Sequence, residues 1–322
     1  MSYEIIDFNE GQKFLNWNDL CKVLKSGHDL AKAEVSDTFL YRGKDTLLSR
    51  SAWIDGMGLA VKNATIFPDN SACDLPIVNG AVNLFSDKTG QLEALIDFHL
   101  VTKWKTAGDS LLAAKNLARS DSKNILIIGA GTVANSLRQA YGAGFPDAQF
   151  SIWNRNPEAA VNMAEKYSHT KAVTNLEAAV KEADVVTSAT MATQPIIKGE
   201  WLQAGQHIDL IGAYRPDMRE ADDAALKRAR IFVDNYETTL DHIGELKIPL
   251  SSGAILRNDV VADYYDLSTG RFKRGSDDEI TLFKNGGGAH LDLMVSRYIL
   301  DVWHSTHSCQ IPQSRSRHQT GG

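Results

Sequence analysis

The sequence predicts an α/β protein of two lobes, in which a doubly wound parallel sheet follows a first lobe of different character. The chain has 322 residues, and because single hydrophobic cores stop growing near about 250–300 residues, it is expected to divide. Short apolar segments alternate with helical patterns between residues 123 and 235. The first 118 residues lack that alternation, so they are expected to form a separate lobe.

The first lobe is predicted to contain a β-hairpin and a long helix. Residues 75–98 form two apolar runs joined by the turn residues DKTG, a pattern typical of an antiparallel hairpin. Apolar residues from Leu100 to Ala114 then recur at helical spacing, which predicts a helix over 99–119. A last helix is expected over 291–303, and residues 310–322 are interpreted as a frayed or added tail.

The second lobe has the pattern of a parallel sheet. Its apolar segments are rich in Val and Ile, as strands buried on both faces are, and Val133, Leu137 and Tyr141 between them recur at helical spacing. Such βαβ alternation predicts a doubly wound sheet. The predicted strands are 124–129, 148–154, 183–190, 207–213 and 229–235, and further helices are predicted near 157–166, 175–182 and 220–229.

The composition indicates a soluble, cytoplasmic protein that acts on small molecules. With 43% hydrophobic and 23% charged residues the chain is of the globular class. It contains neither an export signal nor an apolar run of the roughly 18 residues that span a membrane. A net charge of -6 argues against nucleic-acid binding. Cys21, Cys73 and Cys309 are widely spaced and predict neither disulfides nor a metal site.

The segment ILIIGAGTVANSL at 125–137 predicts a dinucleotide site. It contains G-x-G-x-x-A at Gly129, Gly131 and Ala134, directly after a predicted strand and at the start of a predicted helix. In this context the main-chain amides of the first helical turn, at Thr132 and Val133, face a pyrophosphate, and the glycines let it approach. The alternative is a glycine-rich turn that binds nothing.

The residues after the second predicted strand favour NADPH, with NADH possible. An NAD site usually places an acid there for the ribose 2′-hydroxyl, whereas this chain has Asn154, Arg155 and Asn156. A guanidinium at this point suits a 2′-phosphate, and the alternative is a solvated arginine. Thr190 and Met191, at the end of the predicted strand 183–190, are expected close to the cofactor; small residues there equally suit packing.

Three cations of the first lobe are candidates for binding a substrate anion. Arg50, Lys62 and Lys105 lie within apolar segments, where burial of their charge is unfavourable unless an anion pairs with them. A substrate carboxylate would fill that role. The alternative for each residue is an ordinary place on the solvated surface.

A series of motifs follows one another along the chain: KNATIFPDN, TGQLEALID, VTKWKTA, IGAGTVA, WNR, GAYRPDMRE and GGGAHLDL. In these motifs and their order, over about 40–303, the sequence resembles the ornithine cyclodeaminase and mu-crystallin family. The resemblance implies a Rossmann-type domain at 119–290 inserted into an α+β lobe, formed by 1–118 with 291–322, that binds the substrate and makes a homodimer.

The resemblance also implies roles for individual residues. Arg50 and Lys62 match carboxylate-binding positions, with Lys62 also near the reacting carbon, and Lys105 stands where the family commonly has arginine. Asp292 matches an aspartate near the nicotinamide and the substrate, although an acid is also favourable in the first turn of a helix. His290 beside it is interpreted mainly as a packed histidine.

Tyr214 sets the expected reaction. Cyclodeaminases carry an aspartate at this position, and RPDMRE resembles instead the branch of mu-crystallin and the bacterial cyclic ketimine reductases. The resemblance therefore implies reduction of 1-pyrroline-2-carboxylate and 1-piperideine-2-carboxylate to L-proline and L-pipecolate. The alternatives are a cyclodeaminase or hydroxyproline dehydratase, a dehydrogenase of open-chain amino acids such as alanine, and a mu-crystallin-like binding protein.

Overall fold

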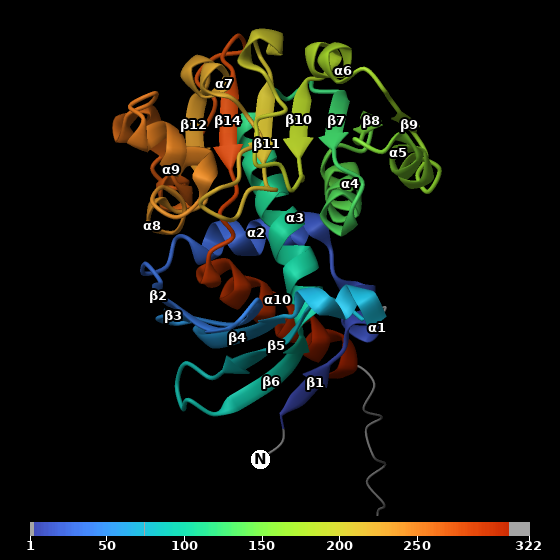
Figure 1. The fold of residues 1–322 in the computed structure, drawn as a ribbon. Coiled ribbons are helices and arrows are strands. Elements are labelled where there is room, and N and C mark those ends of the chain that lie inside the picture. The colour runs from blue at the N-terminus through green and yellow to red at the C-terminus, as the bar shows by residue number, and fades with distance from the viewer. Residues whose placement is uncertain (1–2, 74, 309–322) are drawn as a thin grey trace, which may run out of the picture.

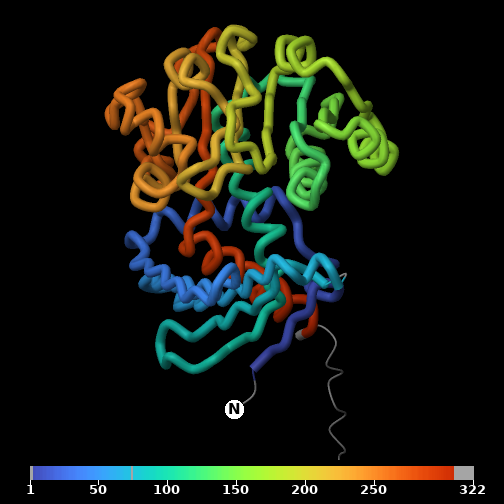
Figure 2. The backbone as a smooth tube through the Cα atoms, in the orientation of Figure 1, coloured from blue at the N-terminus to red at the C-terminus, as the bar shows by residue number. Residues whose placement is uncertain are grey.

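The computed structural model describes residues 3–73 and 75–308, which form two lobes, one above the other in Figure 1. The lower lobe contains a six-stranded sheet and the upper lobe an eight-stranded sheet. Figure 2 shows the chain beginning in the lower lobe, passing to the upper lobe and returning at its C-terminal end. The two ends of the described chain therefore belong to the same lobe.

The lower sheet has the strand order β1-β6-β5-β4-β3-β2, in which β1 runs parallel to β6 and the other pairs are antiparallel. Its register places Arg50 of β3 opposite Asp37 of β2 and opposite Lys62 of β4. Its strands are β1 (Glu4–Ile6), β2 (Glu34–Arg42), β3 (Asp45–Ile54), β4 (Gly58–Ile66), β5 (Val78–Phe85) and β6 (Leu92–Asp97), and its helices are α1 (Phe8–Gly11), α2 (Trp17–Gly27) and α10 (Ala289–Ser308).

The hairpin and the long helix predicted for the first lobe are confirmed. Strands β5 and β6 pair antiparallel, and Gly90 in their turn has a φ of 65°, which favours glycine. Helix α3 (Phe98–Leu117) follows at once. The carboxylate of Asp97 accepts a hydrogen bond from the main-chain N–H of Leu100, so the last residue of the strand caps the helix.

The upper sheet is parallel throughout, with the order β13-β12-β14-β11-β10-β7-β8-β9. Figure 1 shows the carboxyl ends of its strands facing the lower lobe. Its strands are β7 (Asn124–Ile128), β8 (Gln149–Trp153), β9 (Thr170–Ala172), β10 (Val185–Ser188), β11 (His207–Leu210), β12 (Arg230–Val233), β13 (Val260–Ala262) and β14 (Thr281–Lys284). Its helices are α4 (Thr132–Gly144), α5 (Pro157–Ala164), α6 (Leu176–Glu182), α7 (Asp223–Arg228), α8 (Tyr236–Thr239) and α9 (Gly244–Ser251).

Apolar side chains cover both faces of this sheet. Ile125 and Ile127 of β7 pack in the core that contains α3 and α4, whereas Leu126 and Ile128 pack in a second core with α6 and α7. Successive strand residues point to opposite faces, so a strand buried on both faces needs a continuous apolar run. The predicted doubly wound α/β sheet is therefore confirmed.

Helix α3 extends from the lower lobe into the upper one. Its Leu111 packs against Gly144 at the end of α4, where an added Cβ would lie 2.3 Å from the leucine side chain. The predicted division at 118/119 falls just after α3, and the division at 290/291 falls inside α10, which begins at Ala289. We retain the two-domain division as a proposal.

Several predicted boundaries were wrong. Strands predicted to reach 190 and 213 end at Ser188 and Leu210, and the helix predicted from 220 begins at Asp223. The reason is that the main-chain N–H groups of Thr190 and Ala213, beyond the two strands, donate to the buried carboxylate of Glu220. The N–H of Gly212 donates both to that carboxylate and to the carbonyl of Ser188. The predictions also missed the three-residue strands β9 and β13, as well as β14.

Two of the three cysteines lie in the described part of the chain, where both are free thiols: Cys21 is buried and Cys73 is exposed. Cys309 and the predicted tail at 310–322 lie outside the described residues. Within 3–73 and 75–308, no helix has the combination of length and apolar character needed to cross a membrane.

Candidate active site

The three predicted cations converge on one carboxylate. Lys62 Nζ lies 2.9 Å from Oδ1 of Asp292, Lys105 Nζ lies 3.5 Å from the same oxygen, and a guanidinium nitrogen of Arg50 lies 3.9 Å from Oδ2. The four side chains come from β3, β4, α3 and α10. Asp292 is buried, so its place in the first turn of α10 does not put it in solvent. The structure thus brings together residues that are 242 positions apart in the sequence at most.

Neighbouring groups fix the two lysines. Lys62 donates to Oγ1 of Thr102 at 2.8 Å, and Lys105 donates to the carbonyl of Gly287 at 2.9 Å. The sequence analysis missed Thr102, although it precedes Lys105 by three positions on a predicted helix and therefore shares its face. The backbone around Gly287 has a φ of 65°, which explains glycine at this position.

Arg50 has a second carboxylate partner that the sequence analysis also missed. Its guanidinium donates to the two oxygens of Asp37 at 2.6 and 3.2 Å, and to the carbonyl of Gly287 at 2.9 Å. Three cations therefore face two carboxylates, those of Asp37 and Asp292. Among the groups in contact, cations outnumber carboxylates by one, which suits a ligand with a single carboxylate.

Burial and charge act in opposite directions on this cluster. Burial lowers the pKa of Lys62 to about 8, against the opposing attraction of Asp292. Burial alone would raise the pKa of Asp292, but the charges of Lys105, Lys62 and Arg50 outweigh it and bring that pKa to about 2. Asp292 is therefore ionised at all physiological pH values, whereas Lys62 exchanges a proton near neutral pH.

His290 packs in the interior beside this cluster. Burial lowers its pKa to about 3, so the ring is neutral, and neither ring nitrogen has a hydrogen-bond partner among the described residues. Its ring centroid lies 5.3 Å from that of His28, edge to face. This environment agrees with the interpretation of His290 as a packed histidine.

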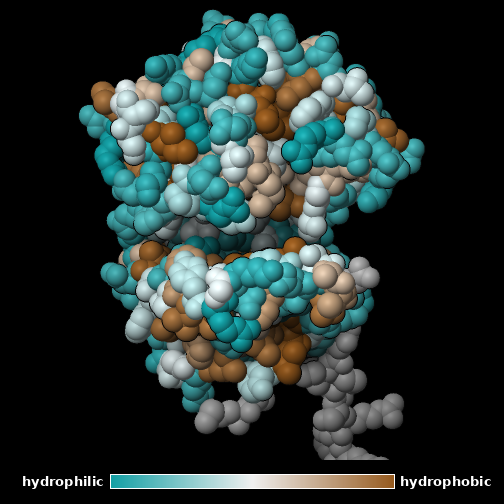
Figure 3. Space-filling view, viewed as in Figure 1, coloured by the Kyte–Doolittle hydropathy of each residue, from teal (hydrophilic) through white to brown (hydrophobic). Residues whose placement is uncertain are grey.

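A cavity of about 330 Å³ joins the cations to the predicted cofactor residues. Arg50 and Lys105 line it from one lobe, and Val133, Thr190 and Met191 line it from the other. Figure 3 shows the surface hollowed between the two lobes.

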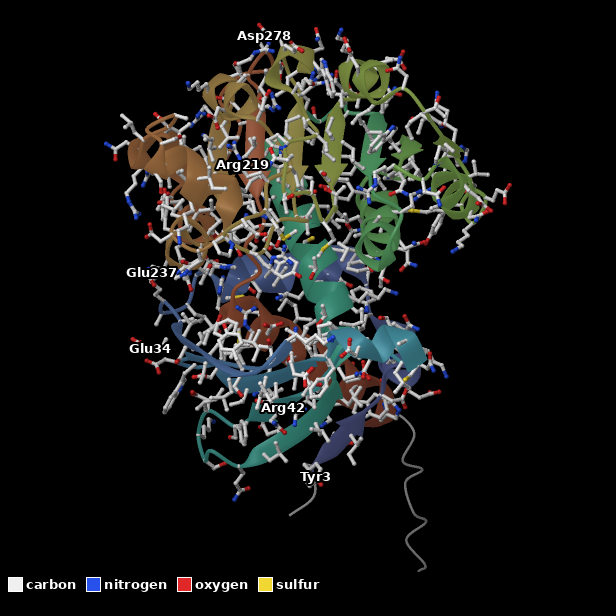
Figure 4. The ribbon with its side chains drawn as sticks, viewed as in Figure 1. Tyr3, Glu34, Arg42, Arg219, Glu237 and Asp278 are labelled. Atoms are coloured by element: carbon white, nitrogen blue, oxygen red, sulfur yellow. The ribbon has the colours of Figure 1, made fainter. Side chains whose placement is uncertain are left out.

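Tyr214 lines the same cavity and is 59% exposed. A second cavity of about 430 Å³ shares Arg50 and Tyr214 and extends between β2 and α8. Glu237 and Glu34, labelled in Figure 4, mark those two elements. An ion pair of 2.6 Å between Lys32 and Glu237 connects the two lobes there.

The glycine loop fits a pyrophosphate. It lies where the chain reverses direction across the sheet, because β7 is followed by β8 and β9 on one side and by β10 on the other. Gly129 has a φ of 114°, and an added Cβ would lie 2.7 Å from the carbonyl of Ala189. Gly131 is the N-cap of α4 without a side-chain cap, and a Cβ there would meet nothing within 4 Å. The first turn of α4, at Thr132 and Val133, thus faces open space.

The predicted 2′-phosphate residues lie beside this loop, since the N–H of Gly129 donates to the carbonyl of Trp153 at the end of β8. Asn156 caps α5 by accepting from the N–H of Glu158, and Asn154 donates to the carbonyl of Asn156. These bonds order the turn. Arg155 between them is exposed and accessible to a ligand.

Comparison with known proteins identifies the family. The family model described as "Ornithine cyclodeaminase/mu-crystallin family" matches residues 52–307. The chain belongs to this family. It is 49% identical over 305 residues to a Delta(1)-pyrroline-2-carboxylate reductase of Paracoccus denitrificans, covering 93% of this chain and 96% of the relative.

Two solved structures of similar proteins match this chain over almost its whole length. The Delta(1)-pyrroline-2-carboxylate reductase of Thermococcus litoralis, in complex with NADH and L-proline, has a TM-score of 0.86 at 28% identity and covers 95% of this chain and 98% of its own. An archaeal alanine dehydrogenase dimer with bound NAD has a TM-score of 0.87 at 28% identity, with the same coverage. The predicted family and fold are confirmed.

Within 3–73 and 75–308, no three His, Cys, Asp or Glu side chains lie together in a way that could hold a metal ion. We call the group formed by Arg50, Lys62, Lys105, Asp37 and Asp292 the charged centre.

Proposed function

We propose that this protein is an NAD(P)H-dependent oxidoreductase that reduces cyclic imino acids, 1-pyrroline-2-carboxylate to L-proline and 1-piperideine-2-carboxylate to L-pipecolate. One observation carries the proposal: a single cavity is lined by the cations Arg50 and Lys105 on one side and by Val133, Thr190 and Met191 on the other. The names of the Paracoccus and Thermococcus relatives support it.

The charged centre binds and orients the substrate. Arg50, Lys105 and Lys62 hold the substrate carboxylate, which fixes the ring in the cavity. A reduced nicotinamide, when bound, supplies the hydride that the imine carbon accepts. Lys62 donates a proton to the ring nitrogen, since a pKa of about 8 leaves it protonated but acidic enough at neutral pH. Asp292 keeps the Lys62 ammonium in place at 2.9 Å.

The preferred cofactor in this proposal is NADPH, with NADH as a second possibility. Gly129, Gly131, Thr132 and Val133 would hold the pyrophosphate. The support for the 2′-phosphate is the exposed guanidinium of Arg155 beside the glycine loop, in a position where NAD sites usually carry an acid.

We also propose a cytoplasmic homodimer. Free Cys21 and Cys73 suit a reducing compartment.

The support for the dimer lies in β2. This edge strand of the lower sheet exposes large apolar side chains, a surface that a second copy would cover. These are Phe39, Leu40 and Tyr41, with exposed fractions of 47%, 62% and 72%. The archaeal relative is named a dimer. Light scattering of Tyr41→Glu against the unaltered protein tests this: a monomer is expected for the variant.

An assay with several substrates tests the activity. The purified protein is incubated with each cyclic imine and with NADPH or NADH, and oxidation of the cofactor and formation of the amino acid are followed. Parallel reactions contain L-ornithine with NAD, and pyruvate with ammonia. The proposal expects turnover of the cyclic imines. Ammonia release from ornithine would contradict the proposed reductase and indicate a cyclodeaminase. Turnover of pyruvate with ammonia but of neither cyclic imine would indicate an alanine dehydrogenase.

A further inference from the structure

Glu220 accepts hydrogen bonds from the segment that follows β10. Its Oε1 accepts from the hydroxyl of Ser188 at 2.6 Å, from the main-chain N–H of Thr190 at 2.8 Å and from the Thr190 hydroxyl at 2.9 Å. Because β10 ends at Ser188, the sheet offers no partner to the N–H of Thr190. The carboxylate takes the place of a neighbouring strand.

The other oxygen of Glu220 holds the segment that follows β11. Its Oε2 accepts from the main-chain N–H groups of Gly212 at 2.6 Å and Ala213 at 3.3 Å. Five donors therefore converge on one carboxylate: three from Ser188 at the end of β10 and Thr190 after it, and two from the segment after β11. An ionised carboxyl suits this arrangement best, since both of its oxygens then act only as acceptors.

Opposing influences act on the ionisation of Glu220. The side chain is fully buried, and burial raises its pKa, against the opposing charge of Lys284 and the bonds from Ser188 and Thr190. Lys284 is itself fully buried and donates to the carbonyls of Leu210 and Asn285 at 2.9 and 2.7 Å. The lysine thus connects the carboxyl ends of β11 and β14.

The backbone of Glu220 is fixed as well. Its N–H donates to Glu245 of α9 at 2.6 Å, and its carbonyl accepts from the N–H groups of Ile196 and Ile197, both at 2.9 Å. Arg219, the preceding residue, is labelled in the upper lobe in Figure 4. The side chain therefore projects from a backbone that cannot shift without breaking several bonds.

The two loops held by Glu220 touch each other directly. A Cβ added to Gly212 would lie 2.0 Å from the carbonyl oxygen of Thr190 and 2.3 Å from its nitrogen. Residues 189–191 and 211–214 of these loops also line the cavity that contains Arg50 and Lys105. A displacement of one loop is passed to the other and changes the cavity wall opposite the cations.

We infer that Glu220 is a positioning residue, which fixes both loops and thereby sets how the nicotinamide half of the cofactor faces the charged centre. The inference rests on the proposed function for its cofactor and substrate. Glu220 acts through Thr190, Gly212 and Ala213 and touches neither reactant. None of the hydrogen bonds that Glu220 accepts comes from the glycine loop at Gly129 and Gly131, which would hold the other half of the cofactor.

Substitution Glu220→Gln tests the inference. The amide nitrogen cannot accept hydrogen bonds, so the donors of one of the two loops lose their acceptor. We expect kcat for cyclic imine reduction to fall about 100-fold, the effect of roughly 1 Å of misplacement. The Kd for NADPH should change less than about threefold, because most binding contacts of the pyrophosphate are unaltered. Ser188→Ala, which removes one donor only, should lower kcat by a smaller factor and serves if Glu220→Gln does not fold.

Asp184→Asn is the matched control. Asp184 accepts from the main-chain N–H groups of Lys123 and Asn124 at 2.9 and 2.8 Å, at the opposite end of the same sheet. This variant should lose thermal stability and keep its kcat. Equal losses of kcat in the two variants, or a loss of stability alone in Glu220→Gln and Ser188→Ala, would overturn the inference.

A spectroscopic measurement separates this inference from the proposed function. The fluorescence lifetime of NADH at saturating protein reports the surroundings of the nicotinamide without any substrate. In Glu220→Gln and Ser188→Ala it should shift toward that of free NADH, and in Asp184→Asn it should not. If the unaltered protein reduces no cyclic imine, the proposed function fails, and the lifetimes still decide the role of Glu220.

Discussion

Replacing Asp292 with Asn removes the negative charge at the centre of three cations. The pKa of about 2, in place of about 3.9, corresponds to roughly 2–3 kcal/mol in favour of the ionised form in the folded protein. Breaking a buried ion pair by removing one partner typically costs about 3–5 kcal/mol. We therefore expect Asp292→Asn to destabilise the protein by about 3 kcal/mol at neutral pH.

The effect depends on pH with a definite sign. The folded pKa of Asp292 lies below its unfolded value, so its contribution is complete above about pH 4 and is lost as the pH falls toward about 2. The stability difference between the unaltered protein and Asp292→Asn should therefore shrink below about pH 4. Urea unfolding at several pH values measures it.

The same substitution changes catalysis through Lys62. Attraction by Asp292 is the largest influence that raises the pKa of this buried lysine, which is about 8 in its presence. In the unaltered enzyme the rate should fall as the pH rises through about 8, where Lys62 loses its proton. In Asp292→Asn this decline should begin at least about one pH unit lower, since a lysine left without its partner deprotonates more easily.

Glu93→Gln provides the control, because Glu93 pairs with Arg297 at 2.7 Å in the same lobe at a more exposed place. It should cost less than about 1 kcal/mol and leave the pH profile unchanged. A stability loss in Asp292→Asn no larger than that of Glu93→Gln, together with an unmoved decline in rate, would refute the reasoning.

Three further substitutions test the remaining assignments. Arg155→Ala should raise the KM for NADPH by about 10-fold, a loss of roughly 1–3 kcal/mol, and leave the KM for NADH nearly unchanged. Equal effects on the two KM values would contradict binding of the 2′-phosphate by Arg155. Arg50→Met should lower kcat/KM for the imine severely while NADPH titrations stay normal, and failure of cofactor binding would instead make Arg50 structural. Tyr214→Phe should reduce the rate strongly only where the hydroxyl donates to the substrate, so kinetics of this variant distinguish donation from packing.

The sequence predicted the parts of the site better than their arrangement. Gly129 and Gly131 were found because a strand, a loop and a helix are contiguous in the chain. Arg50, Lys62 and Lys105 were found one by one, as charges in apolar segments. Their convergence on Asp292 depends on contacts between β3, β4, α3 and α10, which no local pattern contains.

The missed residues have the same explanation. Asp37 meets Arg50 through the register of β2 and β3, and β2 lacks the alternation of apolar and polar residues that would have predicted a strand, because its side chains are largely exposed on both faces. Glu220 was placed at the start of a helix, since its bonds to residues 30 and 8 positions away leave no local signal. Helix propensity depends on residues close in sequence, whereas the partners of this carboxylate are distant in sequence and close only in the folded structure.

The course of α3 limits how the enzyme can open. The helix has 20 residues, which gives a rod of about 30 Å, and its two ends are packed into different lobes. Lys105 lies near the middle of this rod. Swinging one lobe away from the other would have to bend this helix or remove one of its ends from the core, so α3 opposes a hinge motion between the lobes.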